Sequence, residues 1–176
     1  MNTVTILLTR RRWNLISWGI RWAMPRSRFA LALSSHAIVV AGGLYYEATM
    51  LHGVRRDSAD VVLAGQHVVR SVVHAVPDLA AGIAWAEAQL CQFRATAPAW
   101  LPDALRPLYC AIQMVLHSNY DWKGAFGLGL APGRNWADED CWFCYEFAAG
   151  WLRAAGRPMF ANLSHVGETA LLAVAS

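Results

Sequence analysis

The residues best suited to chemistry are a cysteine pair late in the chain and a histidine early in it. Cys141 and Cys144 stand three residues apart in DEDCWFCYEFAAGW, where a helical pattern begins. A thiolate is favoured in the first turn of a helix, because free N–H groups and the helix dipole stabilise negative charge there. Steps of three and four back from Phe147 and Ala148 place Cys144 on the inward stripe. The pattern predicts a nucleophile at Cys144, with an inert buried thiol as the alternative.

The acidic surroundings of this pair work against a thiolate, so a basic partner is required. The acids are Asp138, Glu139, Asp140 and Glu146. The stretch SSHAIVVAGGLYYEA predicts a hairpin around Gly42-Gly43 and supplies His36 as that partner. With a two-residue turn, paired positions sum to 85, so Ile38 faces Glu47.

Within this hairpin, His36 and Glu47 are expected on one face as diagonal neighbours, within reach of each other. An acid that orients an imidazole, together with a helix-start thiol, fits the orienter, base and nucleophile of covalent catalysis. A turn one residue longer would put the two side chains on opposite faces. The other histidines, His74 among them, show no partner pattern and are assigned structural roles.

The elements that must hold these residues are of mixed type, with strands mostly early. Besides the hairpin, the pattern predicts strands at Val4–Leu8 and Gln66–Val76 and helices at Trp13–Met24, Pro77–Arg94, Leu101–His117 and Cys144–Ala155. Pro25 stops the first helix and Gly156 the last. The glycine-rich stretch NYDWKGAFGLGLAPGRNW is expected to be a loop.

Composition limits the protein class. With 56% hydrophobic and 15% charged residues, the chain is too apolar for disorder and long enough for one well-cored domain, residues 1–176. A net charge of +3 gives no reason to expect a nucleic-acid partner. The N-terminus lacks the pattern of a signal peptide, so a cytoplasmic, virion-associated or injected protein is expected. The 18 residues without formal charge between Arg28 and Glu47 are interrupted by serines and glycines, which favours a hairpin over a membrane span.

The blocks SSHAIVV, YYEA, NYDWKGAFG and WFCYEFAAGWLRAAG resemble the circularly permuted papain-like hydrolases, relatives of NlpC-type peptidoglycan endopeptidases and of lecithin:retinol acyltransferase. The resemblance runs from about Val4 to Phe160. It implies an α+β fold of permuted papain-like topology, in which a small, mainly antiparallel sheet packs against helices. It also implies Cys144 as nucleophile, His36 as general base and Glu47 as the residue that orients it.

The implied activity is cysteine-dependent hydrolysis of an amide or ester bond through a thioester acyl-enzyme, without metal or cofactor. Peptidoglycan peptide is the leading substrate class, followed by lipid-like acyl groups. Many relatives have a small serine after the cysteine, whereas this chain has Tyr145, which is expected to narrow the substrate pocket. Trp122 and Asp121 are expected to form a wall and a cap of the substrate groove, with a tight glycine turn as the alternative.

Three other functions stay open. Cys141 and Cys144 form a C-x-x-C, which suits a redox site, although neither a preceding aromatic residue nor a preceding strand accompanies it. Four cysteines in total could hold a metal or an iron–sulfur cluster, but their spacing lacks a second close pair. Finally, the chain could be a non-catalytic structural or binding protein, for example a phage tail component. The basic, tryptophan-rich segment Arg10–Arg28 would then contact a virion or a membrane surface.

Overall fold

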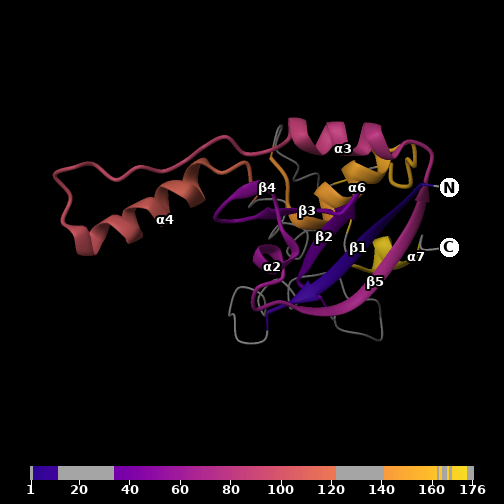
Figure 1. Ribbon diagram of the computed structural model, residues 1–176, viewed down its shortest axis with the longest axis horizontal. Coiled ribbons are helices and arrows are strands. Elements are labelled where there is room, and N and C mark those ends of the chain that lie inside the picture. The colour runs from indigo at the N-terminus through magenta and orange to yellow at the C-terminus, as the bar shows by residue number, and fades with distance from the viewer. Residues whose placement is uncertain are drawn as a thin grey trace.

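A five-stranded sheet is the centre of the computed structural model, which describes residues 2–11, 34–121, 141–161, 163, 166 and 168–173 (Figure 1). Its strands are β1 (Asn2–Arg10), β2 (His36–Ala41), β3 (Leu44–Thr49), β4 (Gly53–Asp57) and β5 (His67–Val76). They lie in the order β4-β3-β2-β1-β5, and each neighbouring pair is antiparallel. The expected α+β class with a small antiparallel sheet is confirmed, while the permuted topology stays a proposal.

The two faces of the sheet differ because successive side chains of a strand point to opposite sides. One face is apolar and joins helices α3 (Leu79–Ala88) and α6 (Cys144–Ala154) in a single core. The buried strand residues on this face include Val4, Ile6, Leu8, Ala37, Val39, Tyr46 and Ala48. All residues of α6 from its start to Leu152 are buried. A helix that is buried on all sides holds its first residue firmly in place.

Gly82 allows α3 to approach α6 closely. A Cβ atom at this position would lie 2.6 Å from the ring of Trp151, closer than any side chain tolerates. Trp151 itself is fully buried. The absence of a side chain at Gly82 therefore fixes the packing of the helix that begins with Cys144.

The β2–β3 hairpin has the turn that the sequence predicts. Gly42 and Gly43 have φ angles of 58° and 80°, the left-handed backbone that a two-residue hairpin turn requires and glycine tolerates. Val40 pairs with Tyr45 and Ile38 with Glu47, so the predicted register is confirmed.

The predicted helix 77–94 is too long, because α3 ends at Ala88. Its start is correct, since the Asp78 side chain caps the helix by accepting the Ala81 N–H at 2.9 Å. Beyond the helix, the Cys91 N–H donates to the Val54 carbonyl at 2.8 Å. This bond to β4 draws the chain away from a helical path. Neither β4 nor the short helix α2 (Ala59–Val62) was expected from the sequence.

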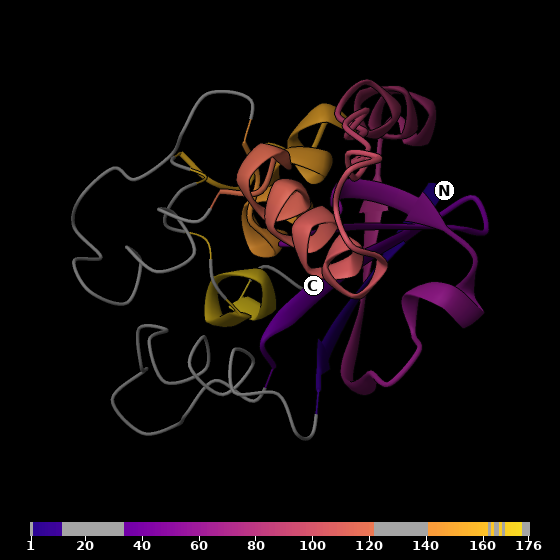
Figure 2. The same cartoon turned by 90° about the vertical axis from the view of Figure 1, so that its left-hand side faces the viewer.

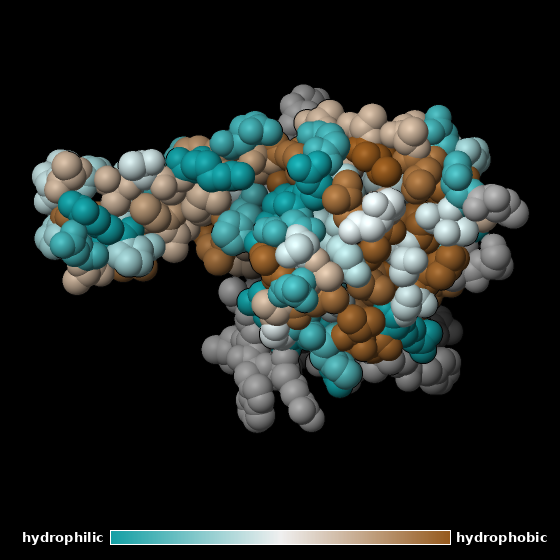
Figure 3. All heavy atoms as spheres, viewed as in Figure 1, coloured by the Kyte–Doolittle hydropathy of each residue, from teal (hydrophilic) through white to brown (hydrophobic). Residues whose placement is uncertain are grey.

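Residues 92–118, called the arm here, project from the body of the molecule (Figures 1 and 2). An extended segment runs outward, and η1 (Asp103–Leu105) and α4 (Arg106–His117) lead back. The predicted helix 101–117 ends where expected, but the chain becomes helical only at Asp103 and begins with this 3₁₀ turn. The space-filling view shows the arm standing clear of the body on the left (Figure 3). The last described helix, α7 (Glu168–Ala173), packs on α6.

Some expectations lie outside the described residues, namely the helix Trp13–Met24 and most of the glycine-rich stretch. Among the helices in the described ranges, none combines the length and apolarity needed to cross a bilayer.

Candidate active site

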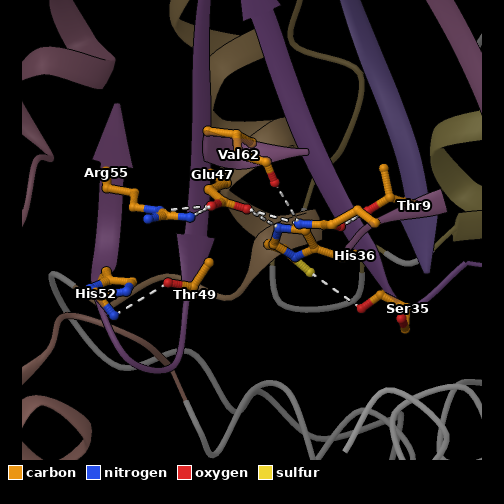
Figure 4. A network of polar contacts seen from close by, with 10 residues as sticks. Thr9, Ser35, His36, Glu47, Thr49, His52, Arg55 and Val62 are labelled. Carbon is orange, nitrogen blue, oxygen red and sulfur yellow. Dashed lines mark hydrogen bonds and ion pairs between the residues drawn. The ribbon is translucent and has the colours of Figure 1, made fainter. Parts of the chain in front are cut away.

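His36 and Glu47 form the centre of the candidate site. The hairpin register puts both side chains on one face of the sheet, and Nε2 of His36 lies 2.7 Å from Oε2 of Glu47. The Glu47 side chain is fully buried and that of His36 is 16% exposed. The predicted diagonal pair is therefore present, with its acid inside the protein and its imidazole at the border of solvent (Figure 4).

Cys144 is the first residue of α6, one position after the N-cap Phe143, as the sequence predicts. Its thiol contacts the Ser35 carbonyl at 4.0 Å, the contact drawn from the sulfur in Figure 4. Its sulfur also acts on the His36 imidazole, whose pKa it raises. Since Nε2 of His36 is engaged by Glu47, Nδ1 is the ring nitrogen left for an interaction with the sulfur. The sulfur of Cys144, the imidazole of His36 and the carboxylate of Glu47 thus lie in series.

The ionised forms of His36 and Glu47 stabilise each other. Burial would lower the pKa of His36, but the negative Cys144 sulfur and the Glu47 carboxylate outweigh it and raise this pKa to about 10. Burial would raise the pKa of Glu47, but His36 and Arg55 hold it below its ordinary value. Both neighbours of the imidazole thus favour its charged form.

Arg55 is a site residue that the sequence did not reveal. It pairs with Glu47 in the β3–β4 register, and its Nε donates to Oε1 at 2.7 Å while Nη2 bonds the same oxygen. A strand predicted next to the hairpin would have pointed to Arg55. The stretch VRRD is mostly charged, however, which is not typical of a strand. Each oxygen of Glu47 consequently has its own charged partner.

A second missed group lies on the other side of the carboxylate. Gln66 reaches Oε2 of Glu47 at 3.5 Å and the Val62 carbonyl at 3.1 Å, and its own amide oxygen bonds the Thr9 hydroxyl. Thr9 is fully buried and pairs with His36 across β1 and β2. Figure 4 draws contacts of this network beside His36 and Glu47.

The predicted substrate-binding residues are placed differently from the catalytic three. Tyr145 is fully buried and its hydroxyl lies 2.8 Å from that of Ser34. Burial raises its pKa well above the ordinary value, with the nearby Cys144 adding to the effect. Asp121 is 1% exposed, so neither residue presents an open surface to a substrate here. Trp122 lies outside the described residues, and the substrate-binding role of all three stays a prediction.

The base of α6 contains a second buried carboxyl group. Glu146 is 3% exposed and is the third residue of α6, a position from which a carboxylate can cap the start of a helix. Burial raises its pKa to about 8, and the nearby Asp121 charge contributes. The first-turn N–H groups, that of Cys144 included, have no partners within the helix. They form a site where a developing oxyanion could be stabilised.

The cysteines give no sign of a metal centre in the described part of the chain. All four are thiols, and the described residues contain no group of three His, Cys, Asp or Glu side chains that could hold an ion. Cys141 is partly exposed, whereas Cys144 is buried. The proposed contact surface Arg10–Arg28 lies mostly outside the described residues.

Comparisons with models of known protein families, with curated proteins and with solved structures find no match.

Proposed function

We propose that the chain is a cysteine-dependent hydrolase that cleaves an amide or ester bond through a thioester on Cys144. The single observation that carries the proposal is the bond of 2.7 Å between His36 and a buried Glu47, with the Cys144 sulfur on the other side of the imidazole. A base that is oriented by an acid and adjoins a thiol at a helix start fits the roles of covalent catalysis, whereas a structural histidine needs neither neighbour.

The reaction would proceed in two halves. The Cys144 thiolate attacks the carbonyl carbon, and the carbonyl oxygen takes up the negative charge beside the first-turn N–H groups of α6, which have no partners within the helix. His36 then gives its Nδ1 proton to the leaving amine or alcohol, which departs as the C–N or C–O bond breaks. In the second half, His36 takes a proton from water, the hydroxide attacks the thioester, and the acid leaves with Cys144 again a thiolate.

Glu47 and Arg55 have positioning roles in this scheme. Glu47 holds the imidazole through Nε2, so that Nδ1 is directed at the sulfur, and it stabilises the imidazolium formed during the reaction. Arg55 fixes the carboxylate through Oε1 and lowers its pKa, so Glu47 stays ionised. The leading substrate class is peptidoglycan peptide, with lipid-like acyl groups next, as the resemblance to permuted papain-like hydrolases implies.

A p-nitrophenyl acyl ester tests the chemistry. We expect a burst of nitrophenol and a mass increase of one acyl group per chain, located on Cys144 and absent in Cys144→Ala. His36→Ala should slow the burst, while Cys110→Ala, which changes a thiol in the arm, should not. An adduct on another cysteine, or none, would contradict the proposal. Turnover of muropeptides is measured separately, and its failure would overturn only the substrate class.

One observation favours the non-catalytic alternative. Cys144 is 2% exposed, which is ordinary for a structural thiol and restrictive for a nucleophile. On this alternative the site would be a rigid polar cluster within a structural or partner-binding protein, such as a virion component. A folded protein whose Cys144 is never acylated or alkylated would support it.

A further inference from the structure

Cationic side chains gather around Gly53, and Arg94 is the one that comes from outside the hairpin. Gly53 is the first residue of β4, and a Cβ atom on it would lie 2.9 Å from that of Cys91, so the chain that follows α3 passes directly against the β3–β4 hairpin. The Arg94 guanidinium donates through Nη1 to the Cys91 carbonyl at 3.0 Å and to the Phe93 carbonyl at 2.9 Å. These bonds keep the positive charge of Arg94 near the hairpin.

The other two groups belong to the hairpin itself. His52 comes directly before Gly53, and Arg55 follows two residues after it. Figure 4 shows both side chains on one side of Glu47, with His36 on the other side. The Arg55 side chain is 22% exposed, and His52 is exposed, so a ligand could reach them. The three groups are called the cationic cluster here: His52, Arg55 and Arg94.

The His52 ring experiences the positive charge of this cluster. Burial is the main cause that lowers the pKa of His52. The charges of Arg55 and Arg94 lower this pKa further. Glu47 and Asp57 act in the opposite direction, with smaller combined effect than the two arginines. The potential at the ring that these four groups create is therefore positive.

The nearby acids do not neutralise the cluster. Both oxygens of Glu47 already have charged partners within the candidate active site. Oδ1 of Asp57 accepts the backbone N–H of the residue that caps α2, at 2.8 Å. Within the described ranges, the ion pairs include none to Arg94 or to the His52 ring. The cluster thus retains N–H donors, among them Nε and Nη2 of Arg94, for an anion from outside.

We propose that the cationic cluster is a subsite for a carboxylate of the substrate, so that the substrate is an acidic peptide or acyl compound with its carboxylate near the scissile bond. The inference rests on the proposed function, because it takes the scissile carbonyl to lie at Cys144. The guanidinium of arginine presents paired N–H donors that match the two oxygens of a carboxylate. A neutral lipid-like acyl group would leave these donors unused.

Binding is tested in Cys144→Ala, which cannot form the thioester. The ring proton of His52, assigned by its loss in His52→Gln, is followed by NMR from about pH 4 to about pH 8 at constant ionic strength. Monomethyl glutarate, on the order of 10 mM, should raise the pKa of His52, because a bound anion favours the protonated ring. Arg94→Gln should remove most of this rise.

Arg56→Gln is the matched control, since it removes the same charge from the opposite face of β4, where Arg56 binds Glu87. It should keep the rise in the pKa of His52, and circular dichroism verifies that the variants fold. Inorganic phosphate is the second probe. A rise with phosphate but not with the carboxylate would overturn the proposal in favour of a phosphate group. No rise with either probe would overturn the subsite.

Turnover tests the role in substrate choice. Mono-p-nitrophenyl glutarate is compared with its methyl ester, and 4-acetoxybenzoate with its methyl ester, so that the carboxylate lies on the acyl group or on the leaving group. In at least one pair, Arg94→Gln should lower the ratio of kcat/KM, charged over neutral, at least about fivefold relative to Arg56→Gln. Unchanged ratios in both pairs, with Cys144 still acylated, would overturn the subsite and leave the hydrolase standing. Absence of acylation would overturn the hydrolase, and with it the carboxylate as part of a substrate.

Discussion

Oε2 of Glu47 lies 2.7 Å from Nε2 of His36, across a hairpin whose register puts both side chains on one face of the sheet. Arg55 binds the other carboxylate oxygen, and the other imidazole nitrogen is left for the Cys144 sulfur. These outer neighbours orient the two side chains. Each neighbour of the imidazole therefore favours its charged form. The predictions below follow from this chain of contacts and from the buried ionisable groups around it.

Replacing Glu47 with glutamine should impair the reaction. The amide keeps the shape but not the charge, so the pKa of His36 falls and Nδ1 is less firmly directed at the sulfur. We expect ester turnover (kcat/KM) to drop about 100-fold, within the range that general acid–base groups contribute. Glu87→Gln is the matched control, since Glu87 binds Arg56 on the other face of the sheet. Equal losses in both variants would argue against a specific role for Glu47.

Arg55→Met should destabilise the protein in a pH-dependent manner. The pKa of Glu47 is lowered in the folded state, so the stability from its ionised contacts is present above the unfolded pKa and lost as pH falls. Without Arg55, a buried carboxylate loses a charged partner, which should cost about 2 kcal/mol at pH 7 and clearly less at pH 4. Urea unfolding at the two pH values measures this. Arg56→Met, at an exposed ion pair, should show no such pH dependence.

Glu146→Gln should stabilise the protein at alkaline pH. Because the folded pKa is raised to about 8, the unfolded chain ionises first, and stability falls as pH rises from about 4.5 to 8. Glutamine keeps the size of the side chain and removes this loss, so we expect a gain on the order of 3 kcal/mol at pH 8 and almost none at pH 4. Thermal unfolding across pH checks the difference. A constant gain at every pH would refute the titration of Glu146 as its cause.

His74 should limit stability in acid. It is fully buried on the core face, and neither ring nitrogen has a hydrogen-bond partner among the described residues. Burial and the nearby Arg157 lower its pKa, so the unfolded chain takes up the proton first and stability declines below about pH 6.5. His74→Leu should recover up to about 2 kcal/mol at pH 5 relative to pH 7. His67→Leu, at an exposed position on the same strand, should recover nothing.

The parts of the site set by local pattern could be predicted from the sequence. Gly42-Gly43 determines a turn, the turn determines the register, and the register brings His36 to Glu47. The start of α6 at Cys144 follows from the spacing of its apolar residues in the same way. Each of these inferences needs contacts within one element or one hairpin.

The parts that depend on tertiary contacts could not be predicted. Arg55 reaches Glu47 from a short polar edge strand that forms only by pairing with β3, and Gln66 enters from beyond α2. Likewise, α3 ends early because Cys91 bonds the Val54 carbonyl, which no local pattern encodes. Burial of Tyr145 against Ser34 is also a property of the assembled core.

Alkylation of the intact protein by iodoacetamide from pH 5 to 10, with the modified residue identified by mass spectrometry, tests the central claim most directly. If Cys144 is paired with the His36 imidazolium, it should react at least about tenfold faster than Cys110 at pH 6, because only the thiolate reacts. The advantage should persist to about pH 9 and disappear in His36→Ala, while Glu87→Gln leaves it intact. A Cys144 that reacts no faster than Cys110 at any pH, with or without His36, would contradict the account.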